Sequence, residues 1–445
     1  MSANPQNNYL STTNPCKVCA PLGACLAIKG IEKAMTILHG SQGCATYIRR
    51  YLISHFREPF DIASSSFDET AAVFGGKDNL GKAIANVEGQ YHPELIAVAT
   101  SCLSETIGDD IFSYCREFNK NSGARLVPVP TPSFSGAQLK GFYLAVFSIV
   151  KTLAGNEEKR QRVNLFPSMY SPADLRHLKQ ITESFGLDAM ILPDYSETLD
   201  GGIWGEYLPV PPGGSPINTI ESSGAADLSI GFSPFIDEEL SAGIYLEKQF
   251  KVPNKTLYPP FGIESTDAFL EELSRLSGLP VPSNLKDERA RLIDAYADCH
   301  KYVFGKKAAV YGDADFTAGM AIFLSEIGIR PIVFPGGPAF PNYAEKLETR
   351  TKDAVIIGGD PDFARIEEFL ADCPADLLIG NSKGYKTARK TETPLVRCGF
   401  PIHDRVGGPR SLHIGYAGAQ ALLDNIVNSL LAAKQEESGF GFFYQ

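Results

Sequence analysis

Short runs of apolar residues recur along this chain, and each is followed by a turn and a stretch in which apolar positions have helical spacing. Continuous apolar runs rich in β-branched residues are typical of strands that are buried on both faces. They predict strands at 94–100, 162–168, 188–194, 228–233, 306–313, 330–336, 353–360, 376–382 and 394–400. Helical spacing is clearest at 171–186, 317–328 and 362–373. Strands that alternate with helices predict parallel sheets covered on both sides, so the fold class is α/β.

Two breaks in this pattern divide the chain. A charged segment at 155–161 separates a long helical stretch from the next strand, and another long helical stretch ends at 300–306. We expect three doubly wound, Rossmann-like domains with parallel sheets, at residues 1–157, 158–304 and 305–445. Because ligands of such sheets bind beyond the carboxyl ends of the strands, residues that follow a strand are the candidates for chemistry.

Composition narrows the class of protein. A chain of 445 residues is too long for a single core. Its 44% hydrophobic and 21% charged residues are those of an ordinary globular protein. A net charge of -11 argues against a nucleic-acid-binding face. The sequence shows no apolar run typical of a membrane span, and its start lacks the charged and apolar regions of a signal peptide. We therefore expect a cytoplasmic protein.

The nine cysteines then need an explanation, because a reducing compartment favours metal-binding or catalytic thiols over disulfides. Four of them lie in or beside apolar patterns and are expected in the core, namely Cys25, Cys115, Cys373 and Cys398. Cys16 and Cys19 form a CxxC pair, which could be a redox dithiol. A thioredoxin-like pair follows a strand, whereas the residues before Cys16 are polar and irregular, so the sequence does not favour this use.

Three cysteines stand in turns or loops with glycine, close to predicted helix starts. Cys19 lies in a loop that runs into a helix, Cys102 directly follows a predicted strand, and Cys44 lies in a turn after Gly40 and Gly43. Thiolates ligate iron–sulfur clusters, helix N-termini lower thiol pKa values, and glycine permits close packing of a bulky cluster. A plain thiol beside a tight turn is the alternative for Cys44. Three thiolates do not complete a four-cysteine cluster, so a non-cysteine ligand or a partner chain would supply the rest.

Several segments taken together resemble the β-type subunit of nitrogenase component 1. They are CAPLGA, HGSQGCATYIRRYLISHFREP, DETAAVFGG, IAVATSCLSETIGDD, TPSF, IGNS and GFPIHDR. The resemblance extends over nearly the whole chain. The superfamily contains molybdenum, vanadium and iron-only nitrogenases, a cofactor-assembly scaffold, and nitrogenase-like reductases such as methylthio-alkane reductase.

The resemblance implies that Cys19, Cys44 and Cys102 are the β-side ligands of the P-cluster, an 8Fe-7S cluster shared with an α-type subunit. It also implies that Ser133, in TPSF, ligates the oxidised cluster, because an alkoxide suits a harder iron. A turn or helix-cap residue is the alternative role of Ser133. Tyr47 is implied to lie near the cluster, although its ring would also suit a core.

A docking surface follows from the same resemblance. In DETAAVFGG, Glu69 and Phe74 match positions where an ATP-dependent iron protein docks. An exposed aromatic ring beside a carboxylate suits a transient partner, which needs an apolar anchor and a charge. The pattern of the sequence alone would place Phe74 in a core.

A mononuclear cation site between two αβ halves is implied as well. Asp294 and Asp298 are four residues apart, hence on one face of a helix. They would join the Arg57 carbonyl oxygen and the Glu58 carboxylate of the second β-type subunit. Oxygen ligands favour calcium, with iron as the alternative. Without the resemblance, the aspartate pair is typical of a solvated helix face.

The sequence also departs from the nitrogenase pattern. Pro130 stands where that pattern tends to have His, Cys16 is an additional cysteine, and the loop at 208–224 differs. These departures favour a nitrogenase-like or alternative reductase. We therefore expect an electron-relay subunit of an α2β2 heterotetramer that reduces a small methylthio compound, with dinitrogen as the alternative substrate. A β-like subunit of the cofactor-maturation scaffold is the alternative, and a non-enzymatic metal-binding partner is a third class.

Overall fold

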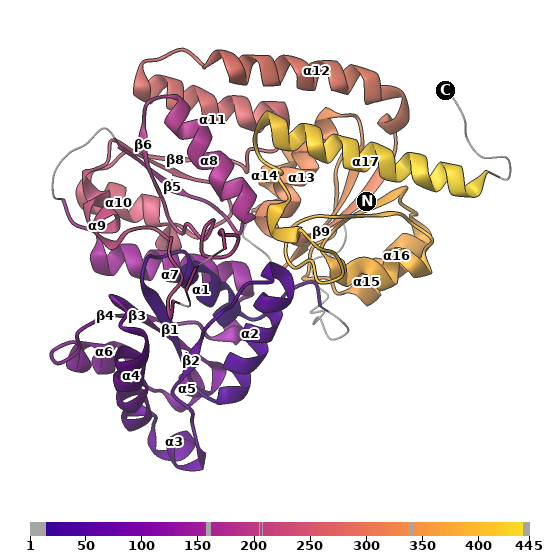
Figure 1. The fold of residues 1–445 in the computed structure, drawn as a ribbon. Coiled ribbons are helices and arrows are strands. Elements are labelled where there is room, and N and C mark those ends of the chain that lie inside the picture. Colours follow the sequence, from indigo (N-terminus) through magenta and orange to yellow (C-terminus); the bar gives the residue numbers. More distant parts are fainter. Residues whose placement is uncertain are drawn as a thin grey trace.

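The computed structural model describes residues 15–156, 162–203, 205–206, 208–337, 342–351 and 353–438. Within these ranges the strands form three parallel sheets, each flanked by helices (Figure 1). The predicted α/β class and the three doubly wound sheets are therefore confirmed. The predicted boundary between residues 157 and 158, and the first 14 residues, where a signal peptide would stand, lie outside the described residues.

The first sheet has the strand order β2-β1-β3-β4. Its strands are β1 (Ala34–His39), β2 (Ala63–Ser64), β3 (Leu95–Thr100) and β4 (Arg125–Val129). Its helices are α1 (Ala20–Lys29), α2 (Gln42–Phe56), α3 (Glu69–Phe74), α4 (Lys77–Tyr91), α5 (Cys102–Ile107), α6 (Ile111–Phe118) and α7 (Gln138–Leu153). Alternate residues of β1 enter different cores, since Leu38 faces the core of α1 and α7 and Ile37 faces that of α4 and α6. A sheet buried on both faces results.

The second sheet has the order β6-β5-β7-β8, and the third has the order β11-β10-β9-β12-β13. The strands of the second are β5 (Arg162–Phe166), β6 (Asp188–Ile191), β7 (Leu228–Gly231) and β8 (Asn254–Thr256), with α8 (Pro172–Ser184), α9 (Ile217–Glu221), α10 (Ala242–Phe250) and α11 (Gly262–Ser277). Those of the third are β9 (Lys307–Asp313), β10 (Arg330–Gly336), β11 (Val355–Ile356), β12 (Leu377–Gly380) and β13 (Leu395–Arg397), with α13 (Ala314–Glu326), α14 (Tyr343–Glu348), α15 (Phe363–Asp372) and α16 (Tyr385–Lys390).

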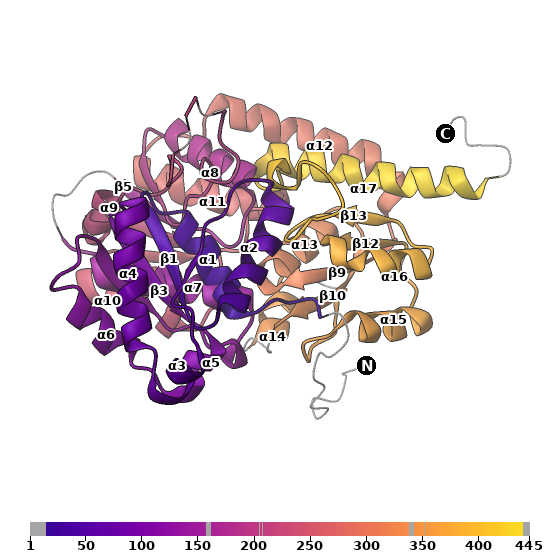
Figure 2. The ribbon, with the colours of Figure 1, turned by 60° about the horizontal axis from the view of Figure 1, so that its bottom comes forward.

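Two long helices run across the second and third sheets. They are α12 (Ser283–Val303) and α17 (Gly415–Glu437), which lie side by side (Figures 1 and 2). In the part of the chain that the structure describes, no helix is long and apolar enough to cross a membrane.

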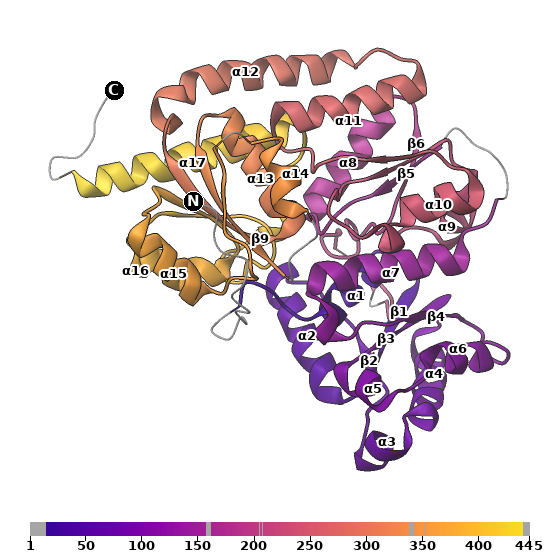
Figure 3. The same cartoon turned by 180° about the vertical axis from the view of Figure 1, so that it is seen from behind.

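The helix pair α1 and α7 lies between the first and second sheets (Figure 3). A Cβ atom on Gly23 would lie 1.8 Å from the Gln138 carbonyl oxygen, and one on Gly141 would lie 1.8 Å from the Ala20 carbonyl oxygen. Only glycine permits this approach of the two backbones. It brings the start of α1, where Cys19 lies, next to the start of α7.

A buried carboxylate joins the three domains. Asp315, at the start of α13, is fully buried. It accepts hydrogen bonds from the hydroxyls of Tyr143 (2.6 Å), Ser168 (2.7 Å) and Ser233 (2.7 Å). Tyr143 lies in the first domain and both serines lie in the second, so one side chain of the third domain contacts both of the others. The pattern of the sequence does not predict this contact.

Candidate functional site

Cys44 and Cys102 lie beyond the carboxyl ends of two neighbouring strands. β1 and β3 are paired in register up to His39 opposite Thr100. Each strand is followed at once by a helix, and Cys44 is the third residue of α2 while Cys102 is the first residue of α5. Both cysteines are exposed. Cys44 was expected in a turn, but the turn ends at Ser41, the N-cap position, so Cys44 belongs to the first helical turn.

Two glycines precede Cys44, and at one of them, Gly40, the packing requires glycine. A Cβ atom on Gly40 would lie 2.1 Å from Ser101 Oγ, so only glycine lets the β1–α2 connection touch the β3–α5 connection. Ser101 in turn caps α5, with its Oγ 3.4 Å from the Ser104 amide nitrogen. A Cβ atom on Gly43 would meet nothing within 4 Å among the described residues.

Cys19 reaches the same edge of the sheet from α1. It occupies the N-cap position of α1 and forms an isolated antiparallel bridge with Ala137, just before α7. The backbone N–H of Gln138 donates to the Val18 carbonyl oxygen over 2.9 Å, and the backbone N–H of Val18 donates to the side-chain Oε1 of Gln138 over 2.7 Å. These bonds fix the segment before α1 against the segment before α7.

Ser133 lies on that second segment, between β4 and α7. It is half-buried and begins the 3-10 turn η1 (Ser133–Ser135). The neighbouring Thr131 hydroxyl donates to the Thr100 carbonyl oxygen over 2.8 Å, which holds this segment at the end of β3. Ser133 lies in a turn and does not cap α7, since Ala137 is the N-cap of that helix, and its role as a cluster ligand stays a prediction.

The electrostatics of Cys19 connect it with the other two thiols. Burial raises the pKa of Cys19, the negative charges of Cys44 and Cys102 raise it further, and the Leu22 backbone N–H lowers it. The sulfur atoms of Cys44 and Cys102 therefore both lie within electrostatic reach of the Cys19 sulfur. Each stands at a helix N-terminus, where partial positive charge favours a thiolate. A thiolate at Cys19 nevertheless needs further positive charge, such as that of bound metal ions.

A buried hydroxyl beside Cys19 has no partner in the described structure. The hydroxyl of Tyr51 is buried without a hydrogen-bond partner among the described residues. Burial raises the pKa of Tyr51, and the charges of Tyr47 and Cys19 raise it further. Among the described residues, no three His, Cys, Asp or Glu side chains are close enough to hold one metal ion. Three thiols from separate elements and an unpartnered hydroxyl suit a group larger than a single ion.

Large apolar side chains are exposed on α2, on α5 and in the turn η1. Tyr47 is 59% exposed, Phe134 is 74% exposed, and Leu103 is also exposed. The interpretation of Tyr47 as a core residue is therefore wrong for this chain. Large apolar side chains gathered around candidate ligands are typical of a surface that another protein covers.

Helix α3 presents a second apolar group at the far tip of the first domain (Figure 1). Asp68 caps it by accepting from the Ala71 amide over 2.8 Å, and Glu69 is its exposed first residue. Phe74, its last residue, is 85% exposed, and Val73 is 73% exposed. Phe74 is therefore no core residue, contrary to what the sequence pattern alone indicates.

The residues predicted to bind a cation lie on two separate elements. Arg57 ends α2 in the left-handed conformation (φ 64°), and Glu58 beside it is half-buried, with a pKa raised chiefly by burial and further by the charge of Asp200. Asp294 and Asp298 are exposed on α12. The described part of one chain does not gather these groups into one site. A site shared by two copies stays a prediction.

Of the six remaining cysteines, Cys16, Cys25, Cys115 and Cys398 are buried, and Cys299 and Cys373 are half-buried. Cys16 is buried in the core of the third domain with Tyr311 and Phe334, and burial raises its pKa to about 12. It does not share the exposed edge with Cys44 and Cys102, so it is neither an added ligand there nor half of an accessible dithiol. Core positions are confirmed for three others, Cys25, Cys115 and Cys398, while Cys373 is half-buried at the edge of a core.

Fold and site together define a three-domain α/β protein whose thiols gather at the strand ends of its first sheet. The model of the family described as nitrogenase component 1 type oxidoreductase matches residues 19–431. The nitrogenase molybdenum-iron protein beta chain of Clostridium pasteurianum is 37% identical over 433 residues, which cover 95% of this chain and 94% of that protein. The chain belongs to the nitrogenase component 1 type oxidoreductases and is a β-type subunit.

A second beta chain and a solved structure also resemble this chain over nearly its whole length. The beta chain of Methanococcus maripaludis is 36% identical over 437 residues, which cover 94% of each protein. A chain of the solved structure of nitrogenase Cp1 at pH 6.5 superposes with a TM-score of 0.92 and 35% identity, covering 98% of this chain and 97% of that one. A chain of nitrogenase Cp1 at pH 5, with a TM-score of 0.72 and 16% identity, shares the fold alone.

Proposed function

We propose that this chain is the electron-relay subunit of a nitrogenase-like reductase, and that it holds half of a P-cluster at its interface with an α-type subunit. The observation that carries the proposal is the convergence of Cys19, Cys44 and Cys102 at one edge of the first sheet. The nitrogenase beta chains that resemble this protein support it.

The residues at this edge fit such a cluster. Its chemistry is the storage and transfer of single electrons. The three thiolates would hold the irons of this half, and the helix starts beside them favour the negative charge that thiolates carry. Ser133 offers an oxygen ligand from the end of β4. The unpartnered Tyr51 hydroxyl beside Cys19 is a donor toward the same group.

The partners follow from the exposed surfaces. The apolar surface of Tyr47, Leu103 and Phe134 would be covered by the α-type subunit, and Glu69 and Phe74 of α3 would dock an ATP-dependent iron protein. Two αβ units would form the α2β2 assembly.

A cation would join the two αβ units. The Arg57 carbonyl oxygen and the Glu58 carboxylate of one copy would meet Asp294 and Asp298 of the other. An all-oxygen ligand set suits calcium, with iron as the alternative.

The substrate would be reduced mainly in the α-type subunit, so this chain does not choose it. Dinitrogen is the candidate that the names of the related beta chains suggest. A small methylthio compound is the candidate that the departure at Pro130 favours. The additional cysteine, Cys16, no longer favours a reductase that differs from nitrogenase. Its thiol is buried and does not reach the edge of the first sheet where Cys44 and Cys102 lie.

Anaerobic purification of this chain with its α-type partner, followed by iron counting and EPR, tests the proposal. We expect redox-active iron well beyond a single four-iron cluster per αβ unit, and electron transfer that depends on the iron protein. Turnover assays with dinitrogen and with methylthio compounds then identify the substrate. A single four-iron cluster without turnover would contradict the relay and indicate the maturation scaffold.

A further inference from the structure

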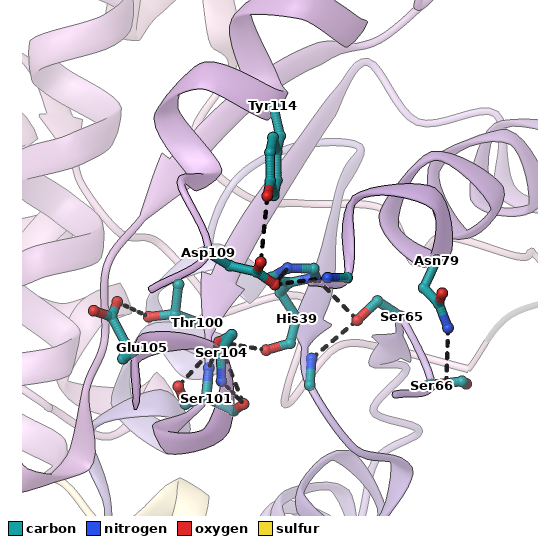
Figure 4. A network of polar contacts seen from close by, with 12 residues as sticks. His39, Ser65, Ser66, Asn79, Thr100, Ser101, Ser104, Glu105, Asp109 and Tyr114 are labelled. Atoms are coloured by element: carbon teal, nitrogen blue, oxygen red, sulfur yellow. Dashed lines mark hydrogen bonds and ion pairs between the residues drawn. The ribbon is translucent and has the colours of Figure 1, made fainter. Parts of the chain in front are cut away.

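A buried histidine–aspartate pair, His39 and Asp109, lies in a network of polar contacts in the first domain (Figure 4). His39 Nε2 is 2.9 Å from Asp109 Oδ2, and His39 Nδ1 is 3.0 Å from Ser65 Oγ. The side chains of His39 and Asp109 are 0% and 4% exposed. His39 ends β1, and Asp109 follows α5.

The aspartate holds the end of α3. The Gly76 amide donates to Asp109 Oδ2 over 3.0 Å, and the Tyr114 hydroxyl donates to Oδ1 over 3.3 Å. Gly75 has a positive φ of 95°, and a Cβ atom there would lie 3.0 Å from Asp109 Oδ1. The chain therefore turns around this carboxylate directly after Phe74.

The histidine holds the helix starts at the cysteine edge. Its carbonyl oxygen accepts from the Ser101 amide over 3.1 Å and from the Ser104 hydroxyl over 2.8 Å. Its ring contacts Ser65, whose Oγ accepts from the Gly40 amide over 2.9 Å. Gly40 leads to Cys44, and Ser101 directly precedes Cys102.

These bonds have one consistent direction. A carboxylate only accepts, so His39 Nε2 carries a proton and donates it to Asp109. Burial lowers the pKa of His39 although Asp109 raises it, which favours the neutral ring at pH 7. Nδ1 then accepts from the Ser65 hydroxyl, which itself accepts from Gly40. A buried chain with every donor and acceptor paired is rigid, and it transmits displacement between its ends.

On the basis of the proposed docking at α3, we infer that His39 and Asp109 are positioning residues that couple binding at Phe74 to the segments carrying Cys44 and Cys102. The partner recognised at Phe74 is a protein that buries an aromatic ring. Contact of this partner with Phe74 restricts the motion of Gly75 and Gly76, and these residues restrict the motion of Asp109. Through its hydrogen bonds, His39 then restricts the motion of the starts of α2 and α5.

Hydrogen exchange of the assembled α–β complex, with and without the iron protein at saturation, tests the inference. We expect bound iron protein to slow exchange in residues 69–76 and, through the pair, by about three- to tenfold in residues 40–47 and 101–107. Asp109→Ala should keep the first effect and reduce the second to less than twofold. Asp109→Asn should restore it, because its amide oxygen can accept from His39 and Gly76 while its NH2 group donates to Tyr114.

Two further variants keep the test decisive. His39→Leu breaks the same chain at another residue and serves if Asp109→Ala does not fold. His413→Leu is the matched control, because it removes another buried histidine–aspartate contact, with Asp174 at 3.1 Å, that lies outside the first domain.

The outcomes separate this inference from the proposed function. Wild-type slowing at 40–47 that persists in both Asp109→Ala and His39→Leu overturns the coupling and leaves the docking intact. Slowing that His413→Leu abolishes equally also overturns it, because the effect would then reflect stability alone. An absence of slowing at 69–76 in the wild type refutes the proposed docking itself and removes the basis for the coupling.

Discussion

Replacement of Phe74 by Ala should weaken binding of the iron protein strongly. A phenylalanine side chain carries about 150–250 Å² of surface, and 85% of Phe74 is exposed in this chain. At about 25 cal/mol per Å², complete burial of that surface would contribute about 3–5 kcal/mol. Desolvation and ordering at the interface reduce this contribution, so we expect a loss of about 2–4 kcal/mol, typical of an anchor residue.

That loss corresponds to a Kd raised by about 30- to 700-fold. Anaerobic calorimetry of the α–β complex with the iron protein measures it directly. Phe112→Ala is the matched control, because Phe112 is a 52% exposed phenylalanine on α6, outside the proposed docking helix. The reasoning is refuted if Phe74→Ala and Phe112→Ala both leave the Kd within twofold of the wild-type value.

Three more predictions concern the fold and the assembly. Asp315→Ala leaves three buried hydroxyls without an acceptor and should lower the free energy of unfolding in urea by at least about 3 kcal/mol; a loss below about 1 kcal/mol would contradict the role given to this carboxylate. Burial and the charge of Asp315 raise the pKa of Asp313 to about 7, whereas an unfolded aspartate titrates near 4. Between about pH 4 and 7 the folded chain therefore holds a proton on Asp313 that the unfolded chain has released, so the free energy of unfolding falls as pH rises through that window. Asp313→Asn should flatten this dependence of the free energy of unfolding on pH. An unchanged slope in the variant would contradict the raised pKa of Asp313. Chelation of calcium, or the substitution Asp294→Asn, should separate α2β2 into αβ units in sedimentation. Asp287→Asn, on the same helix, should leave the tetramer intact. A tetramer that survives both chelation and Asp294→Asn would rule out the cation.

The pattern of the sequence predicts the central strands better than the edge strands. β3 and β9 are continuous apolar runs and lie where they were predicted. β4 was missed because Pro128 interrupts it, and proline is tolerated there since β4 is an edge strand. β1, with the sequence AMTILH, is the exception, an interior strand that the pattern does not predict; its first residue is alanine, which has weak strand preference.

The candidate thiols can be found from the sequence, but their surroundings cannot. Residues that follow strands can be read from a sequence, and this placed Cys102 correctly at a helix start. The contact of His39 with Asp109 joins residues 70 positions apart, and the contact of Tyr143 with Asp315 joins residues 172 apart. No periodicity links such pairs, because tertiary packing alone brings them together. Exposure of Phe74 is equally invisible to pattern, since a lone aromatic residue in a helix is usually buried.

The ligand role of the three cysteines is the central claim, and the iron content of Cys44→Ala tests it most directly. The variant and the wild type would each be purified anaerobically with the α-type subunit, and iron would be counted per αβ unit alongside the EPR signal of the oxidised cluster. Cys115→Ala is the control, because this cysteine is buried in the core of α4 and α6. We predict that Cys44→Ala loses iron and alters or abolishes the cluster signal, while Cys115→Ala retains both. Equal iron content and an unchanged signal in Cys44→Ala would contradict the account.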